Sequence, residues 1–555
     1  MAWNFADVVE AVAEVSNDEH PACIHAGPGG SAGITISWPE LMRRSNRLAR
    51  YLATQGLRPD SKVAHYMRNC PAYIETMVAS FKGRYVHVNV NYRYRDNELH
   101  YILDNSDAEA VVYGAEFREH VAALRPRLPK VRVWIEVTPY FEQPQDRAPE
   151  FAVCYDDIVG EGDGSPLDIE RSGKDLLFIY TGGTTGMPKG VMWEHEAIWQ
   201  AGGSGASLLN PGQAAPESPA EHAQRVAKAP MRGKMLAACP LMHGTAMLTS
   251  INTLTQGGCV VTVPEHSLDP HAMWATVERY RVNSLAIVGD AFAKPLLRAL
   301  EEKPGSYDLS SVMGIVSSGV MWSPEVKRGL LRHNPNMVLM DSFGASEAIG
   351  FGTSRTTGDE EATTAKFTIG EHCKVFTENH RPVQPGSGEP GFIARPGPIP
   401  VGYYKDPEKT AKTFPVIDGV RYSVPGDWCV VEADGTLTLL GRGSVCINSG
   451  GEKIYPEEIE ESLKTHPNVE DALVVGVPDE RWGQAVTGVV VPADPAKFDE
   501  AALREHVKSQ LAPYKAPKRI LISNVPLRAP NGKADYKSVT DFARAAVGNV
   551  PGAER

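Results

Sequence analysis

The sequence predicts an α/β protein with two domains, a large one from residue 1 to 441 and a small α+β one from 442 to 555. The chain has 555 residues, which is more than a single hydrophobic core usually organises. Short apolar runs typical of strands alternate with stretches of helical periodicity. Small and polar residues at Gly441–Ser444 mark the best position for a boundary, because enough chain follows for a compact domain.

Apolar periodicity predicts the elements of the large domain in order. Ile34–Ile36 has the pattern of a short strand, and a helix is expected from about Pro39 to a stop at Gly56. One face of this helix would carry Leu41, Ser45, Leu48 and Leu52. Further strands are expected at Val63–Tyr66, Ala110–Tyr113, Val131–Val137, Gly258–Val263 and Met313–Ser317. This alternation indicates an α/β sheet system rather than an all-α or all-β fold.

The remaining segments complete the two domains. Gly202–Lys234 and Gly352–Lys366 are rich in small or polar residues, and we expect surface loops there, the first with some helix. In the small domain, Glu457–Leu463 and Glu500–Leu511 have helical character, and Ala472–Val477 has that of a strand. This combination predicts a compact α+β domain.

Composition narrows the classes of function. The formal net charge of -12 at pH 7 argues against broad binding to nucleic acid or to anionic lipid. The first residues lack the basic and apolar regions of a secretory signal, and no apolar run reaches the roughly 18 residues of a membrane span. The eight cysteines are scattered without a CxxC pair, which argues against a zinc ribbon or a dithiol redox site. A cytoplasmic protein with reduced, buried thiols is therefore expected.

The strongest signal for chemistry is a glycine-rich loop that follows an apolar strand. Asp175–Tyr180 is the strand, and Thr181–Gly190 reads Thr-Gly-Gly-Thr-Thr-Gly-Met-Pro-Lys-Gly. Glycines let backbone N–H groups converge on an anion, threonine hydroxyls add donors, and Lys189 supplies charge. A structural glycine turn would not need three hydroxyls and a lysine. Neither the GxxxxGK[ST] of a Walker loop nor a GxGxxG turn is present here, so a phosphate-binding loop of another kind is predicted.

This loop closely resembles the phosphate loop of the adenylate-forming superfamily, which comprises acyl-CoA synthetases, adenylation domains of peptide synthetases and luciferases. Other segments resemble motifs of that family in the same order along the chain: Pro240–Gly244, Ser317–Met321, Asp341–Glu347, Val424–Asp427, Gly441–Arg442, Ile447–Glu460 and Pro530–Lys533. The resemblance covers nearly the whole chain. It implies a large adenylation domain built from several subdomains of mixed sheets and helices, and a small mobile domain that rotates between two half-reactions.

The resemblance also implies the catalytic residues. Lys533 would serve adenylation, Glu347 would hold Mg²⁺, and His243 would lie beside the acyl pocket, with Thr185 of the loop as the fourth catalytic residue. A hard carboxylate oxygen suits Mg²⁺, and a lysine suits the charge that accumulates on phosphate oxygens. ATP, Mg²⁺ and coenzyme A are therefore the expected cofactors and co-substrates.

A nucleotide site follows from the same resemblance. Phe343 would stack on adenine, Ser346 would donate to phosphate, and Asp427 would accept hydrogen bonds from the ribose hydroxyls, close to Arg442. The complete set implied is Thr181, Gly182, Gly183, Thr184, Thr185, Gly186, Lys189, Ser318, Gly319, Val320, Asp341, Ser342, Phe343, Gly344, Ser346, Asp427, Arg442 and Lys533.

Several positions depart from the family pattern. Ser317–Met321 stands where the family usually has a Gly-Gly-Ala stretch, which indicates a reshaped wall. Ser346 replaces Thr, and Phe343 replaces the commoner Tyr while keeping a stacking face. Ser444 stands at the hinge position, where Asp or Lys is usual, and Asn448 replaces a common Lys. The last two leave open how the hinge and the thioester half-site work.

Several segments resemble one branch of the superfamily in particular, the bacterial fatty-acyl and steroid side-chain CoA ligases. They are Tyr180–Gly183, Gly190–Trp193, Gly289–Ala291, Val401–Asp406, Gly441–Ser444 and Asn448–Lys453. A bulky hydrophobic carboxylic acid is thus the expected substrate, with no nucleic-acid partner and no integral membrane segment. Acyl chain length, ring preference and the formation of a homodimer stay open.

Three alternative functions share part of this evidence. A ligase that loads the phosphopantetheine of a carrier protein would carry the same adenylation motifs, although the chain has no obvious Asp-Ser-Leu carrier segment. An oxidative enzyme of the luciferase type is less favoured, because the motifs do not call for oxygen chemistry. A non-catalytic nucleotide-binding protein would be expected to lose Lys533 or Glu347, and both are present.

Overall fold

The computed structural model describes residues 3–17, 19–141, 147–181, 187–205, 214–319, 322, 324–359, 366–442, 447–454, 456–525, 527 and 535–548. Contacts divide the chain into two compact units. The large unit comprises Met1–Tyr92, Leu103–Tyr180 and Gly190–Gly441, and the small unit comprises Arg93–Ile102, Thr181–Lys189 and Arg442–Arg555. In the part of the chain that the structure describes, every helix is too short or too polar to cross a membrane.

The first sheet of the large unit has a parallel central part, with the antiparallel strand β2 (Ser31–Ser37) at one edge and antiparallel strands on the other side. Among the described residues it has fifteen strands, in the order β2 (Ser31–Ser37), β1 (Pro21–Gly27), β11 (Cys259–Thr262), β10 (Lys234–Ala237), β12 (Ser284–Ile287), β13 (Gly314–Ser318), β14 (Val338–Ala345), β15 (Ala348–Thr356), β16 (Lys366–Ile369), β23 (Leu437–Arg442), β22 (Asp427–Val431), β18 (Gly391–Pro396), β21 (Val420–Ser423) and β20 (Val416–Ile417), with β17 (Lys374–Phe376) beside β18. The strands from β1 to β14 are parallel, and β15, β16 and β23 follow antiparallel. Parallel strands place their carboxyl ends at one edge, where ligands of α/β proteins bind.

The second sheet of the large unit is parallel over most of its width. Its order in the described residues is β19 (Gly402–Tyr403), β9 (Lys189–Glu194), β8 (Leu176–Thr181), β4 (Val86–Asn89), β3 (Lys62–Tyr66), β5 (Ala108–Gly114), β6 (Val133–Val137) and β7 (Val153–Cys154). The strands from β8 to β7 are parallel neighbours, whereas β19 pairs antiparallel with β9. The carboxyl end of β8 leads directly into the glycine-rich loop.

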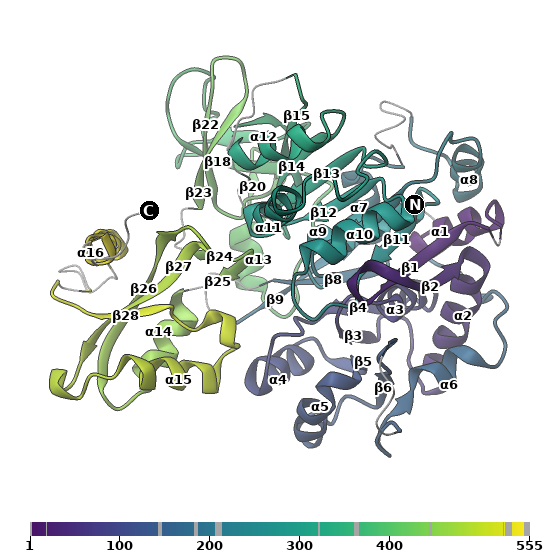
Figure 1. Ribbon diagram of the computed structural model, residues 1–555, viewed down its shortest axis with the longest axis horizontal. Helices are drawn as coiled ribbons and strands as arrows, with labels where there is room; N and C mark the ends of the chain where they lie inside the picture. Colours follow the sequence, from purple (N-terminus) through teal and green to yellow (C-terminus); the bar gives the residue numbers. More distant parts are fainter. Residues whose placement is uncertain are drawn as a thin grey trace. The chain divides into compact units, whose positions relative to one another are not determined.

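Helices join the two sheets into one structure. One hydrophobic core contains strands of both sheets together with α1 (Phe5–Glu14), α2 (Trp38–Thr54), α3 (Pro71–Lys82) and α9 (Gly244–Thr255). A second core is formed by strands of the first sheet with α10 (Pro270–Tyr280), α11 (Gly289–Glu302) and α12 (Pro324–His333). Figure 1 shows these three helices beside that sheet. The unit is completed by α5 (Arg118–Leu124), α6 (Tyr155–Gly160), α7 (His195–Ala201), α8 (Pro219–Ala227) and α13 (Pro407–Thr413), whereas most of α4 (Asp96–Asn105) is counted with the small unit.

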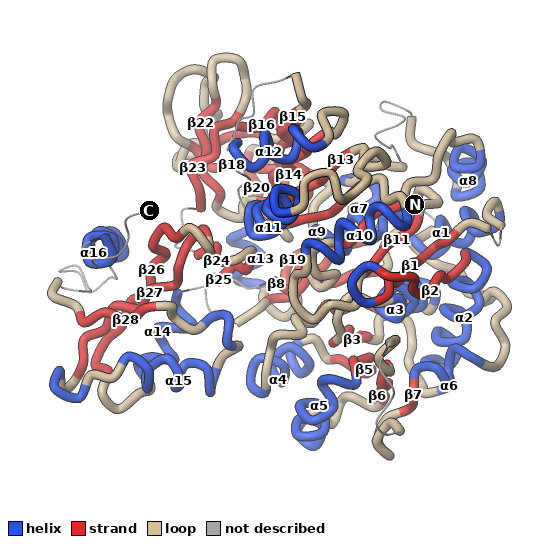
Figure 2. Tube along the Cα trace, viewed as in Figure 1, coloured by secondary structure: helices blue, strands red, loops and turns tan. Residues whose placement is uncertain are grey.

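The small unit is built on a sheet with helices on both faces. Its strands are β25 (Glu452–Ile454), β24 (Ile447–Ser449), β27 (Gly483–Pro492) and β26 (Val469–Asp479), with β28 (Arg519–Ile522) parallel to β27. One core contains α14 (Pro456–Lys464) and α15 (Glu500–Gln510), and another contains α16 (Tyr536–Gly548). Figure 2 distinguishes these helices, in blue, from the strands of the sheet, in red.

The α/β class and the strands expected from periodicity are confirmed. One prediction was wrong in part: the surface loop expected at Gly352–Lys366 begins only after Thr356, because β15 extends that far. Gly352 lies beside Phe343 on one side and Ile369 on the other. Backbone pairing with both neighbouring strands therefore makes this stretch a strand in spite of its polar composition. Such pairing involves residues far away in the sequence, so local propensity does not predict it.

Three histidines are buried between the second sheet and its helices. His65 on β3, His87 on β4 and His195 at the start of α7 are at most 1% exposed. The His65 and His87 rings lie 4.2 Å apart between centroids, and His195 packs on Phe81 at 4.7 Å. Four ring nitrogens of these three histidines have no hydrogen-bond partner among the described residues: both nitrogens of His65, Nδ1 of His87 and Nε2 of His195.

Burial keeps these histidines neutral. Desolvation, with a smaller contribution from His87, holds the pKa of His65 well below its ordinary value. Desolvation, with a smaller contribution from His195, lowers the pKa of His87 to about 3. Desolvation also lowers the pKa of His195 to about 4, against a weaker opposing effect of Asp175. A charged imidazole without a partner costs free energy in an apolar core, so protonation of these rings opposes folding.

Candidate active site

The glycine-rich loop begins where β8 ends. Thr181 is the last residue of β8, Gly182–Gly186 lie outside the described residues, and the chain is described again from Met187. Lys189, half-buried, opens β9. The phosphate-binding role of the loop residues Thr181, Gly182, Gly183, Thr184, Thr185, Gly186 and Lys189 therefore stays a prediction.

The flanks of the loop are held firmly. Tyr180 is 7% exposed and donates its hydroxyl to Oδ1 of Asn105 at 2.8 Å. A Cβ on Gly190 would lie 2.8 Å from the Tyr180 ring, so only glycine leaves room for this ring at that position. The two residues that bracket the loop thus pack against each other.

His243 lies at the carboxyl-end edge of the first sheet. The chain leaves β10, passes through Pro240–Met242 and reaches His243, which is the N-cap residue of α9 and is half-buried. Asn69 supports this passage: its Nδ2 donates to Ala237 O at 3.1 Å and Cys239 O at 3.0 Å. The position is compatible with the expected substrate-side role, which the geometry alone does not test.

The parallel pairing of β13 with β14 brings two predicted segments together. Ser318 lies beside Ser342, and the Ser318 hydroxyl donates to Ser342 O at 2.8 Å. Gly289 N–H donates to the hydroxyl of the buried Ser317 at 2.9 Å. Gly319 follows β13 with φ +89°, a left-handed conformation that glycine adopts without strain, whereas Val320 lies outside the described residues.

Alternation along β14 directs Phe343 into an aromatic cluster. The ring is 7% exposed and lies 5.3 Å from Phe351 and 5.2 Å from Phe367 between centroids, tilted against both. A Cβ on Gly344 would come within 2.9 Å of Ala348 O, which explains the glycine next to this ring. Packing from these phenylalanines fixes the Phe343 ring, and its stacking on adenine stays a prediction.

Asp341 forms a buried ion pair that the sequence did not predict. Its carboxylate meets the ammonium group of Lys327 on α12, whose side chain is 1% exposed. Burial raises the pKa of Asp341, Lys327 lowers it, and Asp290 raises it further. Removing one partner of such a pair leaves an uncompensated charge, so the pair fixes α12 against β14. A nucleotide contact of Asp341 stays a prediction.

Glu347 occupies the turn between β14 and β15 and is 8% exposed. Tyr403 on β19 donates its hydroxyl to Glu347 Oε1 at 2.6 Å, and Ser423 on β21 donates to Glu347 O at 2.6 Å. Trp193 on β9 donates its indole N–H to Ser346 O at 2.8 Å. Tyr403 therefore orients the Glu347 carboxylate, and Ser423 and Trp193 hold the backbone of Glu347 and Ser346.

A hard oxygen ligand at this position fits Mg²⁺. Among the described residues, no group of three metal-ligating side chains is present. Mg²⁺ is usually held by one or two carboxylates together with substrate phosphates, so a single oriented carboxylate such as Glu347 is sufficient. The metal would be bound jointly by Glu347 and a nucleotide.

The last predicted residues lie on later strands and beyond. Asp427, 7% exposed, opens β22 directly after Gly426, whose φ is +99°. Arg442 ends β23, and its side chain is not among those described. Lys533 lies outside the described residues. The ribose contacts and the catalytic lysine are therefore predictions from the sequence.

Tyr403, Lys327 and Asn69 were missed by the sequence analysis. Tyr403 stands inside Val401–Asp406, a segment that carried resemblance but no assigned role. Lys327 and Asn69 act on partners far away in the sequence, and no local pattern identifies such contacts. Each of these three side chains bonds to a segment predicted to belong to the site, and its role is to hold that segment in place.

Two family models match the chain. One, described as AMP-binding enzyme, matches residues 9–404, and the other, described as AMP-binding enzyme C-terminal domain, matches residues 458–533. The first match includes the motif segments from the glycine-rich loop to Asp341–Glu347, and the second includes Pro530–Lys533.

Curated relatives and a solved structure are similar over almost the whole chain. A 3-oxocholest-4-en-26-oate–CoA ligase of Rhodococcus rhodochrous is 40% identical over 554 residues, covering 98% of this chain and 96% of the relative. A medium/long-chain-fatty-acid–CoA/3-oxocholest-4-en-26-oate–CoA ligase of Mycobacterium marinum is 42% identical over 506 residues, covering 90% and 91%. An amide bond synthetase of Marinactinospora thermotolerans has the same fold, with a TM-score of 0.78 at 24% identity, covering 97% of this chain and 99% of that one.

Proposed function

Because this chain belongs to the AMP-binding enzyme family, among its acyl-CoA ligases, we propose that it converts a bulky hydrophobic carboxylic acid, ATP and CoA into acyl-CoA, AMP and pyrophosphate. The observation that carries the proposal is the 40% identity to a CoA ligase over 554 residues, which runs through both matched domains. We assign adenylation to residues 1–441 and the supply of Lys533 to residues 442–555.

In the first half-reaction, a carboxylate oxygen of the substrate attacks the α-phosphorus of ATP, a P–O bond forms, and pyrophosphate leaves. The loop Thr181–Gly190 would donate backbone and hydroxyl hydrogen bonds to the phosphates, and Lys533 would offset their growing negative charge. Mg²⁺ held by Glu347 would add charge stabilisation on the same oxygens. The fixed orientation of Glu347 by Tyr403 supports this role, because a preorganised ligand needs no rearrangement during the reaction.

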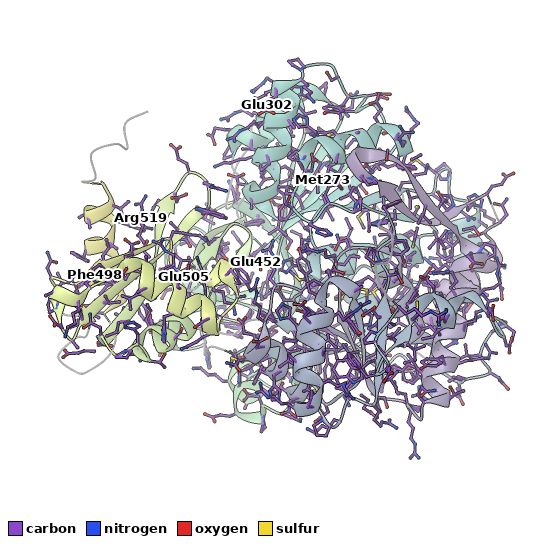
Figure 3. All side chains as sticks on the ribbon, turned by 60° about the horizontal axis from the view of Figure 1, so that its bottom comes forward. Met273, Glu302, Glu452, Phe498, Glu505 and Arg519 are labelled. Carbon is purple, nitrogen blue, oxygen red and sulfur yellow. The ribbon has the colours of Figure 1, made fainter. Side chains whose placement is uncertain are left out.

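In the second half-reaction, the sulfur of CoA attacks the acyl carbon of the mixed anhydride, and AMP leaves. A groove on the small unit offers a place for the charged part of CoA. It is lined by Arg504, Lys508, Pro513, Ala516, Pro517 and Lys518. Glu505 and Arg519, labelled in Figure 3, belong to the helix and the strand that flank it.

The electrostatics of this groove favour an anion. The Lys518 ammonium lies 4.5 Å from the centroid of the Trp482 ring. Burial, and then Arg481, Arg504 and Lys508, lowers the pKa of Lys518 against a smaller opposing effect of Asp479. A positive charge placed among other cations is stabilised by a phosphate. Free CoA supplies phosphates outside its pantetheine arm, so this groove favours CoA over a carrier protein.

Replacement of Lys518 by alanine is expected to raise the KM for CoA about tenfold or more, since a charge-assisted hydrogen bond contributes roughly 1.5–3 kcal/mol. The rate of acyl-adenylate formation should not change. Steady-state kinetics at saturating acid and ATP measure both effects. Lys497→Ala is the matched control, because Lys497 lies in the same unit with its side chain 78% exposed. An unaltered KM for CoA in Lys518→Ala would remove the groove from CoA binding.

The proposed acid is long-chain or polycyclic, like the acids named for the two curated relatives. Buried apolar surface should then supply much of the binding free energy. Each methylene removed from the acid should cost about 0.8 kcal/mol, roughly fourfold in kcat/KM, until the chain no longer reaches the pocket wall.

An acid panel scored by ATP- and CoA-dependent thioester formation tests this substrate class. Long-chain or steroid side-chain acids should be good substrates, and acetate and benzoate poor ones. A short or small aromatic acid that outperforms every long or polycyclic acid at equal concentration would contradict the substrate class and leave the ligase chemistry intact. The cytoplasmic location and a homodimer remain predictions.

A further inference from the structure

Asn89 lies at the carboxyl end of β4, where its backbone pairing with β8 stops. Val88 is the last residue of β4 that pairs with β8, opposite Phe178. Asn89 is 4% exposed, and its side chain extends the contact between β4 and β8 to Tyr180, two residues beyond Phe178. Its Oδ1 accepts from Tyr180 N–H at 2.7 Å, and its Nδ2 donates to Tyr180 O at 3.2 Å.

The same carboxamide reaches a second segment. Nδ2 also donates to Met242 O at 2.7 Å. The amide thus makes two donor bonds and one acceptor bond, all to backbone. A reversed amide would direct its oxygen at two carbonyl oxygens, so the hydrogen-bond network fixes the orientation of Asn89.

The two partners of Asn89 lead into the two halves of the candidate site. Tyr180 directly precedes Thr181 and the phosphate loop, and Met242 directly precedes His243 at the N-cap of α9. The phosphate loop comes after β8 of the second sheet, and the segment with His243 comes after β10 of the first sheet. Asn89 therefore joins, through one buried side chain, the segment expected at the phosphates to the segment expected at the acid.

We propose that Asn89 is a positioning residue that sets the spacing between the phosphate loop and the acid-side segment. The inference rests on the proposed function, because only a reaction between the acid and the α-phosphate requires a defined spacing between these two segments. A carboxylate must approach phosphorus in line at near-contact distance, and a misplacement of about 1 Å can cost roughly a hundredfold in rate. Asn89 supplies this alignment without touching either reactant.

The test compares Asn89→Ala and Asn89→Asp with a matched control, Asn334→Ala. Asn334 is 7% exposed and makes the same set of bonds: it accepts from Asn336 N–H at 3.1 Å and donates to Leu309 O at 2.9 Å and Val312 O at 3.0 Å. It follows α12 and holds the chain ahead of β13, away from the carboxyl ends. Each asparagine makes three hydrogen bonds to backbone groups, so the loss of either should lower stability.

Adenylation is measured by acid-dependent exchange of labelled pyrophosphate into ATP, at a temperature where circular dichroism shows each variant folded. Asn89→Ala should lower the kcat of exchange by roughly a hundredfold with little change in the KM for ATP. Asn89→Asp keeps the acceptor for Tyr180 N–H but loses both donors, and should show a comparable loss. Transfer to CoA from pre-formed acyl-adenylate should suffer much less, because the phosphate loop acts mainly in the first half-reaction. Asn334→Ala should keep the exchange rate of the wild type.

An exchange rate in the Asn89 variants equal to that of the wild type would overturn the inference, as would equal losses in Asn89→Ala and Asn334→Ala. If Asn89→Ala does not fold, Asn89→Asp carries the same comparison. A wild-type enzyme that shows no exchange with any acid contradicts the proposed function itself. The two failures are therefore distinguishable.

Discussion

Lys533→Ala is expected to lower the rate of adenylation by roughly 10²–10³-fold or more, the usual effect of removing one group that stabilises developing charge. Transfer of the acyl group to CoA from pre-formed acyl-adenylate should be largely spared. The reason is that the lysine is assigned to the phosphate charge of the first half-reaction alone, so its contribution vanishes once pyrophosphate has left. Pyrophosphate exchange and single-turnover transfer measure the two halves separately.

Lys464→Ala provides the control for Lys533→Ala, since it removes a lysine from the last turn of α14 in the same unit and has no assigned role. Both halves of the reaction should run at wild-type rates in this variant. Equal loss of both halves in Lys533→Ala would count against a lysine specific to adenylation. Full retention of exchange in Lys533→Ala would remove it from the mechanism.

Acidification is expected to destabilise the large unit through His65, His87 and His195, and the buried His25 and His222, whose pKa values burial also lowers, add to the effect. Their pKa values lie below the ordinary value of about 6.5 that they regain on unfolding, with those of His87 and His195 at about 3 and about 4. The unfolded chain therefore binds more protons below pH 6.5, and stability falls as the pH falls from 6.5 towards 4. At pH 5.5 each histidine should cost about 1.4 kcal/mol and the three together about 4 kcal/mol relative to pH 7.5.

Urea unfolding of the large unit at pH 7.5 and pH 5.5 measures this loss. His195→Asn serves as the comparison, because an amide oxygen can accept the Phe5 N–H that donates to His195 Nδ1 at 3.3 Å. The variant should lose roughly 1.4 kcal/mol of the pH dependence. An identical pH dependence in both proteins would show that His195 does not titrate with unfolding. Rising stability between pH 7.5 and 5.5 would contradict the account for all three rings.

Local signals in the sequence were enough for the fold class and the order of the motifs. The strand β8, which ends at Thr181, and the helix α2, which begins at Trp38, carry their patterns in consecutive residues, so period and capping identify them. The extension of β15 to Thr356 could not be predicted, because its partners Phe343 and Ile369 decide it and lie on other strands.

The residues that hold the candidate site in place likewise could not be predicted from the local sequence. Glu347 and Asp341 could be named from their motif, but Tyr403 and Lys327, which hold them, contact them only in the folded chain. Asn89 joins residues 91 and 153 positions away along the chain. Contacts of this kind depend on how the two sheets meet, and that arrangement comes from the packing of the whole large unit.

The central claim is that the acid passes through an acyl-adenylate on its way to CoA. The most direct measurement incubates the enzyme with ATP, CoA and an acid that carries ¹⁸O in its carboxyl group, followed by mass spectrometry of the nucleotide product. If a carboxylate oxygen attacks the α-phosphorus, AMP will carry one ¹⁸O and appear together with pyrophosphate and acyl-CoA. Unlabelled AMP, or ADP with labelled phosphate, would show that the acid is activated by another route and would contradict the account.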